Sequence, residues 1–178
     1  MRKTILTFGL ISGVVSSLLM GVNMAISNRI GIDIERGYIL GYAAIVLSCL
    51  FIYFGVRSYR ENVSGGVITF ARAFGIGLAI GVISCLFYVV IWEIVYFNFM
   101  PDFLDKYNAY EIAKMKASGA SAAVVQHHIE AQNQMKVLYA NPLFNAALTF
   151  IEPFPVALLV TLISAAVLRK KPALKVAA

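Results

Sequence analysis

The sequence predicts an all-α fold, a four-helix transmembrane bundle with a short helical extracytoplasmic insert between its third and fourth helices. The chain of 178 residues is 60% hydrophobic and 13% charged, whereas a soluble domain is nearer ~25% charged. Four stretches stay apolar over the ~20 residues that a membrane-crossing helix needs. Lysine and arginine gather in the short segments at one side of these stretches. We therefore expect residues 1–178 to form a single membrane domain.

The apolar runs define the expected elements in chain order. We place the spans at about residues 5–26, 38–56, 73–97 and 143–168, and the extracytoplasmic insert at about residues 98–142. The first run follows basic residues, as in a secretory signal, but it exceeds the ~7–15 apolar residues of a signal core. We expect it to be retained as a span. Cys49 and Cys85 lie inside apolar runs and are interpreted as small hydrophobic residues, not as a disulfide.

Lysine and arginine predict the orientation of the spans. With four spans, one side of the membrane receives the N-terminus, the second connection and the C-terminus. The basic residues on that side are Arg2, Lys3, Arg57, Arg60, Arg72, Arg169, Lys170, Lys171 and Lys175. Apart from Glu61 this side has no acid, whereas the insert mixes both signs. Because basic loops stay in the cytoplasm, we expect cytoplasmic termini, and we expect the charge of +6 to contact lipid headgroups, not nucleic acid.

Small residues recur at every fourth position in the first and third expected spans. Fourfold spacing places them on one helix face, where small side chains let two helix backbones approach closely. The helix-packing candidates are Gly9, Gly13, Ser17, Gly21, Gly77 and Gly81. Two interpretations stay open: packing of helices inside one chain, and a homodimer seam.

The insert is expected to form two short amphipathic helices, over about residues 102–115 and 122–139, that either lie on the outer face of the membrane or cap the bundle. His127 and His128 are adjacent, so they lie on different helix faces and do not chelate one metal ion. No cysteine and histidine cluster with the spacing of metal ligands occurs in the sequence. We expect no metal and no cofactor.

Two acids interrupt the apolar spans, Glu93 near the outer end of the third and Glu152 deeper in the fourth. An ionisable side chain costs ~2.5–3.5 kcal/mol at the bilayer centre even on the lenient insertion scale. Both acids are therefore expected to face the bundle or a wet cavity. Tyr96, on the same face as Glu93, and Tyr88 are expected to supply hydroxyl groups.

The sequence around Glu152 gives the fourth span a polar edge. Asn145, Thr149 and Glu152 lie along one helix face, and the prolines at 153 and 155 remove two backbone N–H donors. The candidate intramembrane polar site is Glu93, Glu152, Thr149, Asn145 and Tyr96. Three interpretations stay open: acids that hold the bundle together by hydrogen bonds, a site for an ion, a proton or a small ligand, and, mainly for Glu93, a side chain that extends to the outer membrane interface.

Several segments carry a family resemblance. "RKTILTFGLISG", "GGVITFARAFGIG", "FNFMPDFL" and "LISAAVLRKK" resemble the domain of unknown function 4199 family over nearly the whole chain. The resemblance implies four helical passes and a location in the bacterial envelope, and hence in the inner membrane. It implies no activity and no catalytic residues.

The function expected from these observations is that of a non-enzymatic scaffold or accessory subunit of the bacterial envelope. No GxSxG, HExxH or phosphate-binding glycine loop is present. The expected partners are the lipid bilayer and either a second copy of the chain or an unknown membrane or envelope partner. The alternative is a proton- or solute-coupled transporter, or a subunit of one, that uses Glu93 and Glu152.

Overall fold

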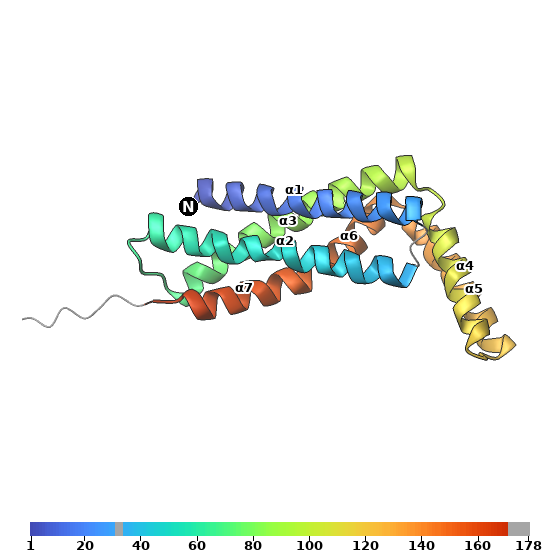
Figure 1. Ribbon diagram of the computed structural model, residues 1–178. Coiled ribbons are helices and arrows are strands. Elements are labelled where there is room, and N and C mark those ends of the chain that lie inside the picture. The colour runs from blue at the N-terminus through green and yellow to red at the C-terminus, as the bar shows by residue number, and fades with distance from the viewer. Residues whose placement is uncertain (31–33, 171–178) are drawn as a thin grey trace, which may run out of the picture.

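The computed structural model describes the backbone of residues 1–30 and 34–170, and the side chains of residues 1–24 and 36–170. In the described chain the helices are α1 Arg2–Ile30, α2 Ile34–Asn62, α3 Phe70–Phe99, α4 Phe103–Ala117, α5 Ala122–Tyr139, α6 Pro142–Ile151 and α7 Phe154–Leu168. The helices α1, α2, α3 and α7 run along one another, and α4 and α5 form a hairpin that projects from one end of the bundle (Figure 1). The predicted all-α bundle with a helical insert is confirmed.

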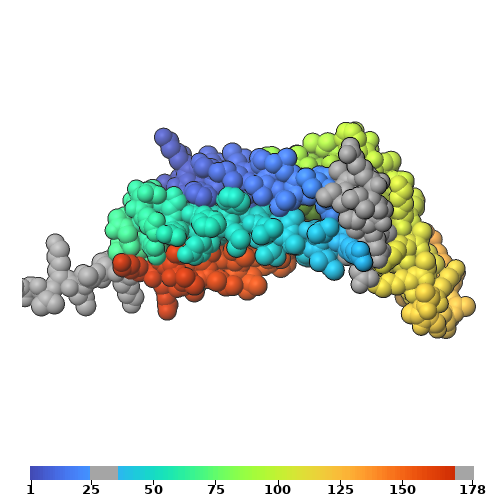
Figure 2. Space-filling view, viewed as in Figure 1, coloured from blue at the N-terminus to red at the C-terminus, as the bar shows by residue number. Residues whose placement is uncertain are grey.

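Four segments are long and apolar enough to cross a membrane: Arg2–Met24, Arg36–Asn62, Phe70–Phe99 and Pro142–Leu168. Figure 2 shows α1, α2 and α7 packed side by side along one face of this bundle. Large apolar side chains stay exposed on each segment, among them Leu18, Leu50, Val90, Leu159 and Val167. A water-soluble bundle of this size would bury such side chains, whereas lipid solvates them. The chain is a multi-pass membrane protein.

The small-residue face of α1 packs against α3. A Cβ atom added at Gly9 would lie 2.8 Å from a methyl carbon of Ile83, and one added at Gly13 would lie 2.6 Å from the Cβ of Phe87. At these distances, positions 9 and 13 have room only for the hydrogen side chain of glycine. Further along the same face, Gly21 has no heavy atom within 4 Å of the position a Cβ would take. Helices α1 and α3 therefore approach each other closely within one chain. Only the part of this face around Gly9 and Gly13 makes the close contact.

Gly77 and Gly81 of α3 face α7 and α2. A Cβ added at Gly77 would lie 3.0 Å from the methyl group of Thr161 in α7 and 3.2 Å from Ile52 in α2. Gly81 stands against Ala157 of α7 at 3.2 Å. Helix α3 thus occupies the centre of the bundle, and the largest fully buried apolar side chains of the core, Ile52, Ile76, Ile80 and Val56, come from α2 and α3.

Three buried serines add polar contacts to this apolar centre. The hydroxyl of Ser12 donates to the carbonyl oxygen of Ser48 at 2.8 Å, and it lies 2.8 Å from the hydroxyl oxygen of Ser84. These contacts join α1, α2 and α3. Ser17, also on α1, instead donates to the carbonyl of Gly13 in its own helix.

The N-terminus, the connection between α2 and α3, and the end of α7 lie together at the bundle end opposite the α4–α5 hairpin (Figure 1). Ile68 and Lys170 exchange backbone hydrogen bonds of 3.0 and 2.9 Å, and Arg60 donates to the carbonyl of Leu168. The side chain of Thr69 accepts a bond from the N–H of Arg72 and caps the start of α3. These contacts hold the basic end of the bundle together.

The fourth span bends between α6 and α7. Glu152 (φ −64°, ψ −59°) and Pro153 (φ −79°, ψ −21°) form the turn and stay near helical geometry. Because proline has no backbone N–H, neither Pro153 nor Pro155 can continue the hydrogen bonds of α6. The chain therefore changes direction at Glu152 without leaving the membrane-spanning segment.

Candidate functional site

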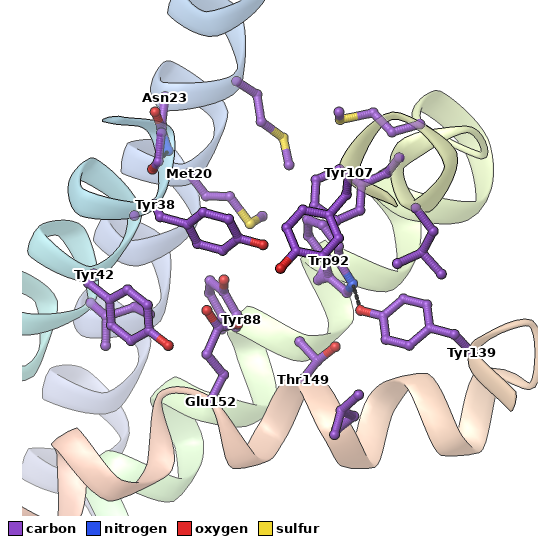
Figure 3. Close-up of a pocket in the computed structure, with 18 of the residues that line it drawn as sticks. Met20, Asn23, Tyr38, Tyr42, Tyr88, Trp92, Tyr107, Tyr139, Thr149 and Glu152 are labelled. Atoms are coloured by element: carbon purple, nitrogen blue, oxygen red, sulfur yellow. Dashed lines mark hydrogen bonds between the residues drawn. The ribbon is translucent and has the colours of Figure 1, made fainter. Parts of the chain in front are cut away.

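A cavity of about 840 Å³ lies at the hairpin end of the bundle. Residues of α1, α2 and α3 line it together with α6, Glu152 and both helices of the α4–α5 hairpin. Its volume falls in the range of ~300–1,000 Å³ that is typical of small-molecule sites. Figure 3 shows that side chains from several helices converge on this space.

Glu152 extends into the cavity from the bend between α6 and α7 (Figure 3). The Glu152 side chain is exposed and lines the cavity. Within the described residues the carboxylate has no hydrogen-bond or ion-pair partner. Thr149, one helical turn earlier, lines the same space. The bend therefore directs an unpaired acid into a large cavity.

Aromatic rings form much of the cavity wall. Tyr38 of α2 and Tyr107 of α4 lie with ring centroids 5.8 Å apart and planes at 73°, and both direct their hydroxyl groups into the cavity (Figure 3). Tyr88 of α3 lies beside Glu152, and Tyr42 lies one turn after Tyr38 (Figure 3). The wall is thus assembled from three different helices.

A hydrogen-bond network supports the cavity from the hairpin side. The indole Nε1 of Trp92 donates to the hydroxyl of Tyr139 at 3.0 Å. The side-chain amide of Asn145 donates to the backbone carbonyl of Tyr139 at 3.4 Å, and its oxygen accepts from the hydroxyl of Thr149 at 3.1 Å. Burial raises the pKa of the Tyr139 phenol. The expected polar edge of the fourth span thus faces inward and ties α6 to α5.

Tyr96 supports this network without lining the cavity. Its ring stacks on Trp92 with centroids 6.0 Å apart and meets Tyr139 edge-on at 5.1 Å. Glu93 also lies outside the cavity lining, and its Oε1 atom is buried without a hydrogen-bond partner. Within the described residues no hydrogen bond or charge interaction joins Glu93 to Glu152. The structure therefore brings Thr149, Asn145 and Glu152 together and leaves Glu93 apart.

Sequence reasoning missed the tyrosines at positions 38, 42 and 107. A signal was present, because Tyr38 and Tyr42, like Tyr88 and Trp92, stand four residues apart and hence on one helix face. Both pairs lie in the part of their spans nearer the α4–α5 hairpin. The sequence left open whether the insert lies on the membrane surface or caps the bundle, and it did not show that Tyr107 of the insert would contact Tyr38 of the second span.

Lys106 marks the mouth of the cavity. Its ammonium group lies 2.8 Å from Oδ2 of Asp102, and the hydrogen bond that it donates lowers the pKa of that carboxyl. A second ion pair, between Lys136 and Asp105, joins the two helices of the hairpin. Within the part of the chain that the structure describes, no three histidine, cysteine, aspartate or glutamate side chains could hold a metal ion.

Fold and site together define a class: a multi-pass helical membrane protein with a polar and aromatic cavity at one end of its bundle. Residues 7–170 match the model of a family described as "protein of unknown function (DUF4199)". The chain belongs to this family, as the resemblance predicted. Neither the search of curated proteins nor the search of solved structures found a match.

Proposed function

We propose that this protein binds a small solute in the cavity around Glu152, as a solute-coupled transporter or a subunit of one. The observation that carries the proposal is the Glu152 carboxylate, which faces a cavity of about 840 Å³ and has no partner among the described residues. A carboxylate at membrane depth is costly without a partner. An acid used only to hold helices together would be hydrogen-bonded to one of them.

The proposed role is non-enzymatic. The described lining of the cavity contains no cysteine and no histidine, and the sequence carries no GxSxG or HExxH motif. Glu93 has no part in the proposed site, because it lies outside the lining.

The proposal places the protein in the bacterial inner membrane with both termini in the cytoplasm, so that the cavity opens on the outer side. It is supported by the basic residues at the bundle end opposite the hairpin (Figure 1) and by the cytoplasmic preference of such residues. The test uses single cysteines in a chain whose buried Cys49 and Cys85 are replaced by alanine. A membrane-impermeant thiol reagent should label Ser118→Cys in intact cells, and Asn62→Cys only after permeabilisation. The reverse pattern would invert the topology.

Solute binding is tested through Trp92, the single tryptophan of the chain, which lines the cavity. The purified protein in lipid nanodiscs is titrated with a panel of small metabolites while tryptophan fluorescence is recorded. A ligand of the site should change the emission of the wild type and of Glu93→Gln, and should lose at least most of its effect on Glu152→Gln. Equal responses of the two glutamine variants would exclude Glu152 from the site.

A scaffold role is the second candidate, and the hairpin favours it. The hairpin projects from the bundle (Figure 1), and α5 leaves Val124, Val137 and Leu138 exposed. A scaffold predicts a partner that co-purifies with the wild type and with Glu152→Gln but is lost from Val137→Glu. A solute-binding role predicts that Val137→Glu keeps the ligand response.

A further inference from the structure

Glu152 sets the charge inside the cavity. Lys106 is the other charged residue in the described lining, but its ammonium is paired with Asp102, and its side chain is 69% exposed at the cavity mouth. The Oδ1 atom of Asn23, a further lining residue, is a buried acceptor without a hydrogen-bond partner. The interior therefore presents unpaired acceptors and no unpaired cation among its described residues.

The tyrosine rings add to this negative character. The face of an aromatic ring carries partial negative charge and attracts cations within ~6 Å of its centroid. Tyr38 and Tyr107 pack edge to face with centroids 5.8 Å apart, and both line the cavity, so that a group beside them in the cavity can contact a ring and a hydroxyl oxygen. Tyr38, Tyr88 and Tyr139 line the same cavity as Glu152 (Figure 3). Carboxylate and rings thus act on one region of space.

The remaining wall is apolar and rich in sulfur. Four methionines line the cavity: Met20, Met24, Met100 and Met135. Methionine is flexible and polarisable, and it adapts to apolar groups of irregular shape. A hydrated metal ion gains nothing from such a wall, whereas alkyl substituents on a cation do.

We propose that the cavity binds an organic ammonium ion, with its charge against Glu152 and its alkyl substituents among the tyrosine rings and the methionines. This proposal rests on the proposed function and names the class of solute. An ammonium ion supplies the counter-charge that Glu152 lacks. An anion would meet the repulsion of the carboxylate, and a lipid tail would leave that carboxylate unpaired.

The test compares two thiol reagents that differ in charge. A single cysteine replaces Thr149, one turn from Glu152 in the cavity wall, in the chain without Cys49 and Cys85. Its modification rate is measured with trimethylammonium-ethyl methanethiosulfonate and with sulfonato-ethyl methanethiosulfonate. The ratio of the two rates is divided by the ratio measured for 2-mercaptoethanol in solution, which removes the intrinsic difference between the reagents. Met100→Cys repeats the measurement at a second lining position.

The expected normalised ratio favours the ammonium reagent by at least about tenfold, because even in bulk water one nearby charge changes each rate several-fold, and it acts with opposite sign on the two reagents. Glu152→Gln should return the ratio to about one, and Glu93→Gln should leave it high. Tetraethylammonium at saturating concentration should slow the modification of position 149 by an uncharged methanethiosulfonate, whereas potassium at equal concentration should not.

Two failures can be told apart. If both reagents modify positions 149 and 100 with a normalised ratio near one, the cavity is open and the preference for cations is wrong, while solute binding survives. If neither reagent modifies either position in protein that remains folded by circular dichroism, the accessible cavity itself is wrong, and the proposed function fails with it.

Discussion

Trp92 and Tyr139, 47 positions apart in sequence, share a buried hydrogen bond of 3.0 Å from the indole Nε1 to the phenol oxygen. The bond joins α3, at the centre of the bundle, to the end of α5, where the hairpin returns to the membrane. Both residues line the cavity. The wall of the candidate site is therefore also the joint that holds the hairpin to the bundle.

Removing this bond should weaken the joint. Tyr139→Phe and Trp92→Phe each remove one partner, and Tyr139→Phe should lower the free energy of unfolding by about 1 kcal/mol. The double variant should lose less than the sum of the two single losses, because the second change removes a bond that is already absent. Denaturant unfolding in detergent micelles measures all four proteins of the cycle. Strict additivity would show that the bond contributes no stability.

Tyr139 also predicts a dependence on pH. Burial raises the pKa of its phenol above the ordinary tyrosine value of about 10. Above that pH the unfolded chain releases the proton while the folded chain retains it, so stability falls as pH rises; below it, the contribution of Tyr139 is fully present. In Tyr139→Phe no phenol ionises at this position, so the variant should lose less stability than the wild type between about pH 9 and about pH 11. Parallel stability curves for the two proteins over that range would contradict the assignment.

Gly13 and Gly21 form a matched pair on one face of α1. A Cβ at position 13 would lie 2.6 Å from the Cβ of Phe87, whereas position 21 has open space. Gly13→Ala should destabilise the bundle by about 1–3 kcal/mol, as overpacking does, and Gly21→Ala should not. Thermal unfolding in detergent measures both. Equal stability of the two variants would show that α1 does not approach α3 at Gly13.

The serines of α1 offer a similar comparison. Ser12 bonds to α2 and α3, whereas Ser17 bonds only within α1. Hydrogen bonds between membrane helices contribute on average about 0.6 kcal/mol and at most about 1.7 kcal/mol. Ser12→Ala should therefore lower stability by an amount in this range, and Ser17→Ala by less. A larger loss in Ser17→Ala would mean that the bond between helices is not the stabilising one.

The bundle could be predicted from the sequence because bilayer thickness alone sets the length of an apolar helix. The inward direction of Glu152 could also be predicted, because Asn145 and Thr149 share its helix face. That prediction needed only the period of one helix.

The composition of the site could not be predicted in the same way. The neighbours of Glu152 depend on how the helices are arranged around α3, and that arrangement is set by close contacts such as Gly9 against Ile83. The spacing in the sequence shows which face of a helix carries small residues, but it does not show which helix packs against that face. Glu93 shows the consequence: the sequence analysis grouped it with Glu152 in one candidate site, yet it lies outside the cavity.

The most direct test of the central claim asks whether an impermeant thiol reagent, added on the hairpin side of the membrane, reaches the cavity beside Glu152. In intact cells, the variant Thr149→Cys should be modified, because this buried position borders the cavity. Thr161→Cys, fully buried in α7 against Gly77 and outside the cavity lining, should not be modified. Modification of position 161 alone, or of position 149 only after permeabilisation, would contradict the account.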